Sequence, residues 1–289
     1  MRILTRSILI IILLITLTYA WLVWKNNQTL TDPEPAQLQT TLEKSIQWLL
    51  QNRERILKQR NAILWHMVQQ AGEITGDARL QQLFSEYDQR YLGRQQNNVW
   101  RPLFYPGTWV AVSYEDIAAL PYYNLHFIYA ILCDEELGSV PEILAQNDPA
   151  FCNRHPLRPA CATHQLMGIL LLQRSQCGDT AELDDTTQQL QQRIRKQLVL
   201  DPRVVDVYMQ RVLMLVESGA DDLVKPVWIK NLIDAQRADG GWSPFEPVLP
   251  LWGDLSIGFD QRILAIRKAQ SHFHMTAQGV LLFSLLTTR

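Results

Sequence analysis

The chain has 289 residues, of which 47% are hydrophobic and 19% are charged, and its formal net charge at pH 7 is −2. This composition is typical of a globular protein with a sizeable core. The length allows one large domain or two small ones. No basic run or patch stands out, which argues against nucleic acid as a partner.

An uninterrupted apolar segment, SILIIILLITLTYAWLVW, occupies residues 7–24. Its length is sufficient for a helix to cross a bilayer. Arg2 and Arg6 precede the segment and only Lys25 closely follows it, so the positive-inside rule places the N-terminus in the cytoplasm. We therefore predict a retained transmembrane signal-anchor over residues 1–25, in the inner (cytoplasmic) membrane.

A cleaved signal peptide is the alternative interpretation of this segment, with residues 18–20, Thr-Tyr-Ala, as the cleavage site. The long apolar run and the bulky Trp21 favour the anchor. Residues 26–35 are polar and contain two prolines, which indicates a short linker. Residues 36–289 are then predicted to form one extracytoplasmic domain.

From residue 36 onward the hydrophobic pattern is helical almost throughout, and more polar helices alternate with more apolar ones. The polar helices are predicted over residues 38–53, 77–92, 181–199 and 222–237, and the apolar helices over 61–72, 122–137, 163–176, 203–217 and 273–287, with a short helix over 140–146. Outer helices keep one face in water, whereas inner helices are packed on nearly all sides. The alternation therefore predicts an inner and an outer layer of helices.

One turn near the C-terminus, residues 236–242, has the specific sequence Q-R-A-D-G-G-W. Gly240 and Gly241 are expected to end the preceding helix, because glycine can adopt the left-handed conformation that a reversal needs. Gln236 is placed to hydrogen-bond the backbone of this turn, and Trp242 to fold back over it. The pattern resembles the Q-x-x-D-G-G-W turn of α/α-toroid proteins, the terpenoid cyclase and protein prenyltransferase-like group.

The resemblance implies an all-α protein in which about five to six helical hairpins form an α/α toroid after the transmembrane helix. An irregular helical bundle is the alternative. A weak internal repeat supports the toroid, since T-H-Q-L-M-G-I-L from Thr163 resembles T-A-Q-G-V-L from Thr276. The resemblance implies no reaction, because the terpene-cyclase D-x-D-D motif is absent and the prenyltransferase zinc pattern does not match.

Two connections, residues 93–121 and 243–271, are longer than simple hairpins need, and both contain several aromatic residues. Such connections are usually functional or disordered. A disordered segment would not contain so many rings. We therefore predict that both are ordered caps over one end of the toroid, and ordinary packing over helix ends is the alternative.

All inner helices of a toroid begin at the same end, so residues in their first turns are expected to converge on one mouth. Five of the six histidines fall at such positions. The candidate catalytic residues are His66, His126, His164, His274 and Tyr208, and the candidate substrate-binding residues are Asn124, Trp65, Trp109, Asp206 and His272. For each single histidine, a structural role in the core is the alternative.

Helix N-termini carry partial positive charge, which favours an anionic or oxygen-rich ligand and disfavours protonated imidazole. The histidines are therefore expected to tend towards the neutral form, which can act as a base. Three classes of function remain open. They are an enzyme acting on a glycan or another envelope polymer, a non-catalytic module that binds a lipid, isoprenoid or glycan, and a structural assembly partner.

The four cysteines allow three pairings in an oxidising compartment. Cys161 and Cys177 fall at opposite ends of one predicted helix, roughly 24 Å apart at 1.5 Å per residue, so they cannot pair with each other. The predicted disulfides are Cys133–Cys177 and Cys152–Cys161, each within one side of the toroid. A metal site would need His126, His164, His274 and Cys161. Their spacing does not support one, and we expect neither a metal nor a cofactor.

Overall fold

The structure, a computed structural model, describes residues 2–93, 95, 97–155 and 157–288, without the side chains of residues 2–5 and 8. Arg2 of the predicted positive flank therefore lies outside the described side chains. The described part contains fifteen α-helices, three 3₁₀-helices and one three-stranded sheet. The protein is mostly helical, as predicted. It is not all-α, because a sheet forms within the second long connection, for which we predicted an ordered cap without strands.

The N-terminal part of the chain is helical and has short helices within the first long connection. Its elements are α1 (Arg2–Lys25), α2 (Pro35–Gln51), α3 (Arg53–Ile56), α4 (Ala62–Thr75), α5 (Ala78–Tyr91), α6 (Arg101–Phe104), α7 (Tyr114–Ile117), α8 (Tyr122–Leu132), α9 (Glu135–Ser139) and α10 (Pro141–Leu144). The helix predicted over 122–137 ends early, because Cys133 adopts a left-handed conformation with φ of 50°.

The C-terminal part contains the sheet. Its elements are η1 (Ala145–Asn147), η2 (Phe151–Arg154), α11 (Cys161–Arg174), α12 (Thr180–Leu200), α13 (Asp206–Glu217), η3 (Asp221–Leu223), α14 (Pro226–Asp234), β1 (Glu246–Pro250), β2 (Leu255–Phe259), β3 (Leu264–Lys268) and α15 (Phe273–Thr287). The strands are antiparallel in the order β1-β2-β3.

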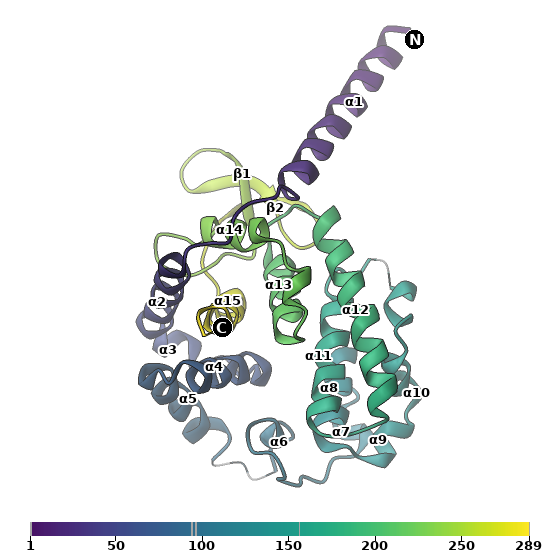
Figure 1. Ribbon diagram of the computed structural model, residues 1–289, viewed down its shortest axis with the longest axis vertical. Coiled ribbons are helices and arrows are strands. Elements are labelled where there is room, and N and C mark those ends of the chain that lie inside the picture. The colour runs from purple at the N-terminus through teal and green to yellow at the C-terminus, as the bar shows by residue number, and fades with distance from the viewer. Residues whose placement is uncertain (1, 94, 96, 156, 289) are drawn as a thin grey trace.

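The helices form two layers around the middle of the molecule (Figure 1). In the inner layer α4 packs against α15, α15 against α13, α13 against α11 and α11 against α8. Outside them, α2 packs on α15, α5 on α4, and α12 on α11 and α13. The inner helix α15 buries eleven of its fifteen residues, whereas the outer helix α5 buries three of fourteen. The predicted alternation of apolar and polar helices therefore corresponds to these layers.

The turn at residues 236–242 is attached to α2. Gln236 Nε2 donates hydrogen bonds to the carbonyl oxygens of Gly240 and Thr41, each at 2.9 Å. Gly240 has a φ of 89°, and a Cβ added there would lie 2.3 Å from the carbonyl oxygen of Lys44. Only glycine therefore allows this conformation and this close approach.

Trp242 closes the same turn against α15. Its side chain is fully buried, its indole nitrogen donates to the carbonyl oxygen of Leu232 at 2.7 Å, and its ring stacks on Phe283 with 5.6 Å between centroids. Gly279 of α15 provides the space, since a Cβ there would lie 2.5 Å from the indole. The turn thus joins α2, α14 and α15.

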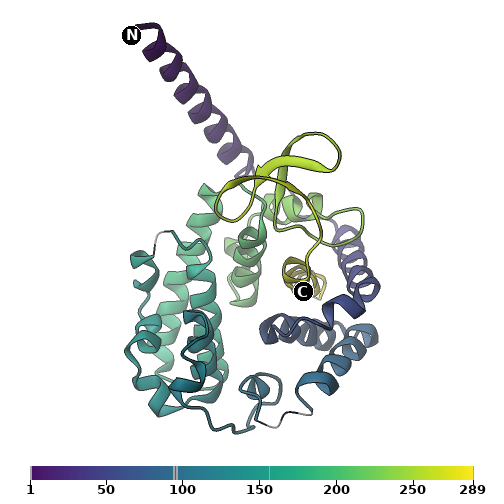
Figure 2. The ribbon, with the colours of Figure 1, turned by 180° about the vertical axis from the view of Figure 1, so that it is seen from behind.

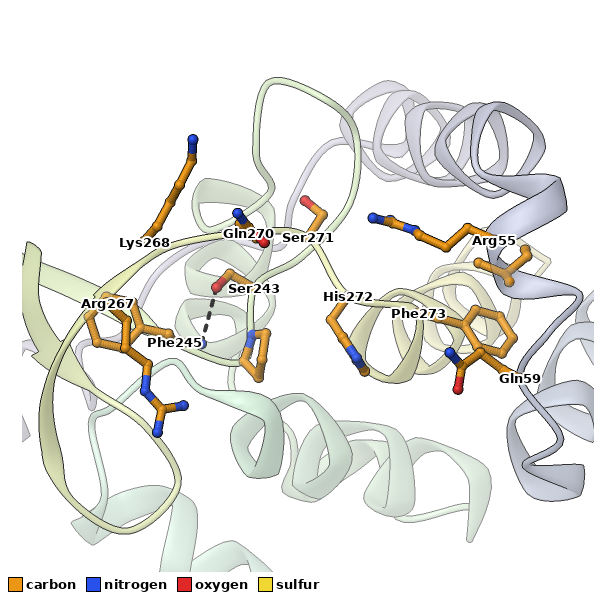
Figure 3. A pocket seen from close by; sticks show the side chains of 12 residues that line it. Arg55, Gln59, Ser243, Phe245, Arg267, Lys268, Gln270, Ser271, His272 and Phe273 are labelled. Carbon is orange, nitrogen blue, oxygen red and sulfur yellow. Dashed lines mark hydrogen bonds between the residues drawn. The ribbon is translucent and has the colours of Figure 1, made fainter. Parts of the chain in front are cut away.

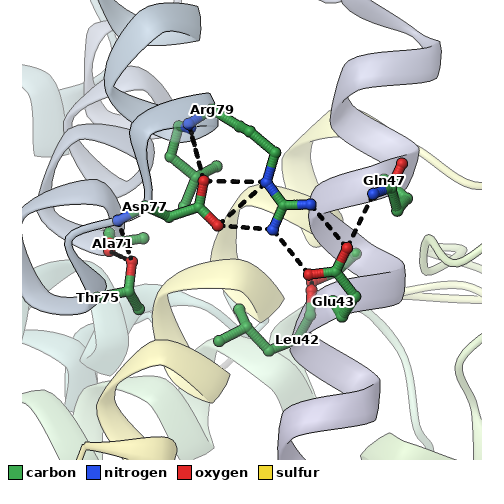
Figure 4. Close-up of polar contacts among 9 residues, drawn as sticks. Leu42, Glu43, Gln47, Ala71, Thr75, Asp77 and Arg79 are labelled. Carbon is green, nitrogen blue, oxygen red and sulfur yellow. Dashed lines mark hydrogen bonds and ion pairs between the residues drawn. The ribbon is translucent and has the colours of Figure 1, made fainter.

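An ion pair joins α2 to the start of α5 (Figure 4). Arg79 donates to both carboxylate oxygens of Glu43, each at 2.7 Å, and also pairs with Asp77, the N-cap residue of α5. Hydrogen bonds from Arg79 lower the pKa of the Glu43 carboxyl to about 2. Because the Arg79 and Glu43 side chains are 39% and 44% exposed, this contact orients the helices more than it stabilises them.

The sheet lies beside the base of α1, as Figures 1 and 2 both show. Lys25 at the end of α1 and Pro247 of β1 line one pocket there. Large apolar side chains of the strands and their turns are more than half exposed, namely Val248, Leu249, Trp252, Ile263, Leu264 and Ile266. Exposed groups of this kind mark interaction surfaces.

α1 projects away from the body of the protein (Figure 1) and is joined to it by a buried contact. Asn26 is 3% exposed, accepts a hydrogen bond from the Tyr208 hydroxyl at 2.8 Å and donates to the Leu198 carbonyl at 2.7 Å. The segment 26–35, predicted to be a linker, therefore begins inside the domain. Among the described residues, no helix combines the length and apolarity needed to cross a membrane.

Both predicted disulfides are present, Cys133–Cys177 and Cys152–Cys161. The first joins the end of α8 to the segment that follows α11, and the second joins η2 to the first residue of α11. Cys161 is therefore not available as a metal ligand.

Replacing Trp242 with alanine should lower the free energy of unfolding by about 3–5 kcal/mol, because it removes a buried ring that contacts two helices. Urea denaturation measures this loss. Trp252→Ala is the matched control, since its side chain is 75% exposed and its loss should stay within about 0.5 kcal/mol. Equal losses in the two variants would contradict the proposed role of Trp242.

Candidate functional site

A pocket of about 500 Å³ lies where the inner helices α8, α11, α13 and α15 begin. Its other walls are the segment before α11 and the turn between β2 and β3. The lining side chains that carry polar or charged groups are Tyr122, Tyr123, Arg158, His164, Asp206, Gln210, Gln261, Arg262 and His274. Four inner helices therefore converge as predicted, and α4 does not contribute.

Asp206 and His274 are hydrogen-bonded to each other within this pocket. His274 Nδ1 lies 2.7 Å from Asp206 Oδ1, and the two side chains are 35% and 10% exposed, respectively. The carboxylate can only accept, so Nδ1 carries the proton. Nε2 is then the His274 nitrogen that is left to act on a substrate.

Two glutamines hold the Asp206 carboxylate in place. Gln278 Nε2 donates to Oδ1 at 3.3 Å, and Gln261 Nε2 donates to Oδ2 at 3.4 Å. Asp206 is also the first residue of α13, where the helix dipole favours a negative charge. A carboxylate fixed in this way orients the imidazole of His274, as in catalytic Asp–His pairs.

The two histidines of the pocket have pKa values shifted in opposite directions. Burial opposes protonation of His274, but the charge of Asp206 and the hydrogen bond to it raise its pKa above the usual value. Burial, and secondarily the nearby His274, lower the pKa of His164 to about 4. The His164 ring also stacks on Tyr123, with 4.1 Å between centroids. The expected tendency towards the neutral form therefore holds for His164, whereas the pKa of His274 is shifted in the opposite direction.

His66 and His126, predicted to point into the same cavity, do not line the pocket. His126 is fully buried with Nε2 2.9 Å from Asn147 Oδ1, and a Cβ at Gly168 of α11 would lie 2.2 Å from its Nδ1. His66 packs edge-on against Phe104 with 5.8 Å between centroids. Burial lowers the pKa of each to about 4. Both face a neighbouring element because each residue along a helix turns the side chain by about 100°.

Four other predicted site residues also lie outside the pocket lining. Tyr208 is fully buried against Asn26, and Trp65 is fully buried and stacks on Tyr87. Trp109 is 79% exposed, and Asn124 lines none of the pockets described above or below. The first two belong to the core because the inner helices are packed on nearly all sides.

His272 lines a separate pocket of about 270 Å³ together with Arg55 and Phe273 (Figure 3). Its Nδ1 accepts a hydrogen bond from the backbone nitrogen of His274 at 3.2 Å, so it caps α15. The described residues therefore form more than the single pocket that we predicted. His272 and His274 line different pockets.

The second long connection reaches the Asp206–His274 pocket through Gln261 and Arg262, whereas the first reaches it only through its last residue, Pro121. The first packs Phe104 against Phe84 of α5 and contains α6 and α7, which lie at the end of the molecule opposite α1 (Figure 1). The sequence reasoning missed Arg158, Gln261 and Arg262, which lie in irregular segments without periodicity. Gln278, which contacts Asp206, lies within the repeat that begins at Thr276, and that repeat was the signal in the sequence that could have identified it.

Within the described part of the chain, no three histidine, cysteine, aspartate or glutamate side chains are grouped as metal ligands. No protein family, no curated protein and no solved structure matches this chain. The geometry of the Asp206–His274 pocket is therefore the basis for assigning a function.

The pKa shifts predict distinct titrations of the two pocket histidines. His274 should titrate above pH 6.5 and His164 near pH 4. Asp206→Asn should lower the pKa of His274 below 6.5, because burial then acts without the opposing carboxylate. NMR titration of the ring Cε1 protons measures both values. An unchanged His274 titration in the variant would contradict the pairing with Asp206.

Proposed function

We propose that the Asp206–His274 pocket is the active site of an enzyme that performs acid–base chemistry on a glycan or another oxygen-rich envelope polymer. The observation that carries this proposal is the 2.7 Å hydrogen bond between Asp206 and His274 in an accessible pocket. A base is most effective when its pKa lies near the working pH. The Asp206 carboxylate raises the pKa of His274 above its usual value, which makes the imidazole a stronger proton acceptor.

The surrounding side chains support a polar substrate over a lipid or isoprenoid. Gln210 Oε1 accepts a hydrogen bond from the Thr163 hydroxyl at 2.7 Å, which leaves the Gln210 amide nitrogen for a substrate hydroxyl or carbonyl. Neutral His164 supplies a further hydrogen-bonding group, and Tyr123 supplies a ring face. A binding module for apolar chains would instead have an apolar pocket.

The layered helices support an α/α toroid as the finer description of the fold. The inner helices follow one another in chain order, α4, α8, α11, α13 and α15, and the last packs against the first. The hydrogen bonds of Gln236 and the buried Trp242 agree with the positions that the toroid-like turn predicts for these two side chains. About five hairpins account for this arrangement.

We also propose that α1 attaches the domain to a membrane, with residues 26–289 outside the cytoplasm. The described leucine and isoleucine side chains between residues 9 and 17 are all more than half exposed, and α1 projects from the body (Figure 1). The exposed apolar side chains of the sheet lie at the same end. The two disulfides agree with an oxidising compartment.

His274→Gln should reduce turnover by about 10²–10⁴-fold, the usual contribution of a general base, with a nearly unchanged melting temperature. Turnover is measured by chromatography of fragments released from purified envelope glycans. His155→Gln is the matched control, because His155 does not line the pocket. Retained turnover in His274→Gln would refute the base, and a large fall in melting temperature would indicate a core residue instead.

A reporter that is active only in the cytoplasm, fused to the C-terminus, should be silent in the full-length protein. The same reporter on a variant lacking residues 1–25 should be active, because that variant has no segment to direct export. Strong activity in the full-length fusion would contradict the proposed topology.

A further inference from the structure

Two arginines line the Asp206–His274 pocket without a carboxylate partner among the described residues. Arg158 lies just before α11, and Arg262 lies in the turn between β2 and β3. Both are largely exposed. A pocket with unpaired guanidinium groups is suited to a ligand that brings its own negative charge.

The neighbouring arginines in the same two regions of the chain are paired. Arg154 lies 3.7 Å from Asp148, and Arg267 lies 3.2 Å from Asp260. Neither Arg154 nor Arg267 lines this pocket. In both regions, the arginine outside the pocket has a carboxylate partner and the one inside it does not.

Arg158 is positioned by covalent and aromatic contacts. The Cys152–Cys161 disulfide closes the short loop that contains it, and the Cys161 backbone nitrogen donates to the Arg158 carbonyl at 3.0 Å. Its guanidinium carbon lies 4.6 Å from the ring centroid of Tyr122, a cation–π contact. These contacts hold the guanidinium group of Arg158 at the rim of the pocket.

Arg262 is positioned by a tight turn. Asp260 Oδ1 accepts hydrogen bonds from the backbone nitrogens of Arg262 and Ile263, at 2.8 and 2.9 Å. The intervening Gln261 donates to Asp206, so the same turn is attached to the carboxylate that orients His274. Arg262 is thereby kept close to the proposed base.

The charge of the pocket is opposite to that of the chain. The two arginines contribute +2 and Asp206 contributes −1, so the lining carries +1 with His274 neutral and +2 with His274 protonated. The whole chain carries −2. A local positive field on an acidic protein concentrates anions at that site.

We propose that Arg158 and Arg262 bind an anionic group of the substrate, a carboxylate or a phosphate, beside the Asp206–His274 pair. The proposal rests on the proposed active site. Guanidinium groups bind both anions through two parallel hydrogen bonds. The substrate class is accordingly an acidic glycan or a phosphate-containing envelope polymer, and a neutral polysaccharide lacks the group that the arginines recognise.

Isothermal titration calorimetry with a galacturonate trimer, its methyl ester and a glycerol phosphate oligomer tests the proposal. At least one anionic probe should bind more tightly than the neutral ester, by about two- to fivefold for each exposed arginine engaged. Preference for the trimer identifies a carboxylate, and preference for the oligomer identifies a phosphate. Equal affinity for all three probes, or no binding of any, overturns the proposal.

The double variant Arg158→Gln/Arg262→Gln should lose the preference, and the matched double variant Arg154→Gln/Arg267→Gln should keep it. Raising the salt concentration should weaken anion binding by the native protein and have little effect on the first variant, because exposed charges are screened. A preference that survives in the first variant overturns the proposal.

Comparing the native protein with His274→Gln tests anion binding and the proposed reaction separately, because the variant lacks the base but keeps both arginines. If the anion preference persists and the native protein shows no turnover, the binding site stands and the enzyme proposal fails. If His274-dependent turnover occurs equally on neutral and anionic substrates, the enzyme proposal stands and the arginine site fails.

Discussion

Buried Trp242 is the residue on which the arrangement of the C-terminal half depends. Its backbone nitrogen donates to Thr276 Oγ1 at 3.2 Å, and its carbonyl oxygen accepts from the His272 backbone nitrogen at 2.9 Å. These two bonds fix the first turn of α15, in which His274 lies. The turn that joins three helices therefore also positions the imidazole of the proposed base, although Trp242 does not line the pocket.

The recognised repeat has a physical explanation in the polar contacts at the starts of the inner helices. Thr163 binds Gln210, and Gln165 donates to two backbone carbonyls of the segment before α11. At the equivalent position of α15, Gln278 binds Asp206. These side chains are buried, where an unpaired polar group costs about 1–3 kcal/mol, so each repeat unit fastens one helix start to its neighbour.

The helical part of the fold could be predicted from the sequence, because burial on one side leaves a helical period of apolar residues and burial on all sides leaves a long apolar run. The predicted 273–287 helix agrees with α15, and both disulfides followed from helix ends. The sheet could not be predicted, because β1 contains Pro247 and Pro250 and its side chains are mostly exposed, so apolar and polar residues do not alternate along it. For the site, first-turn convergence identified Asp206, His164 and His274. It failed for His66 and His126, because a place near the start of a helix does not fix the direction in which the side chain points.

The pocket is coupled to the junction with α1 through the start of α13. Tyr208, two residues after Asp206, donates to the buried Asn26 that ends the α1 segment. The backbone nitrogen of Val204, two residues before Asp206, donates a hydrogen bond to the carboxylate of Glu246 at the start of the sheet. A shift of α1 or of the sheet would therefore move the carboxylate that orients His274. If α1 meets a membrane, the orientation of the domain on that surface and the geometry of the pocket are set by one short segment of chain.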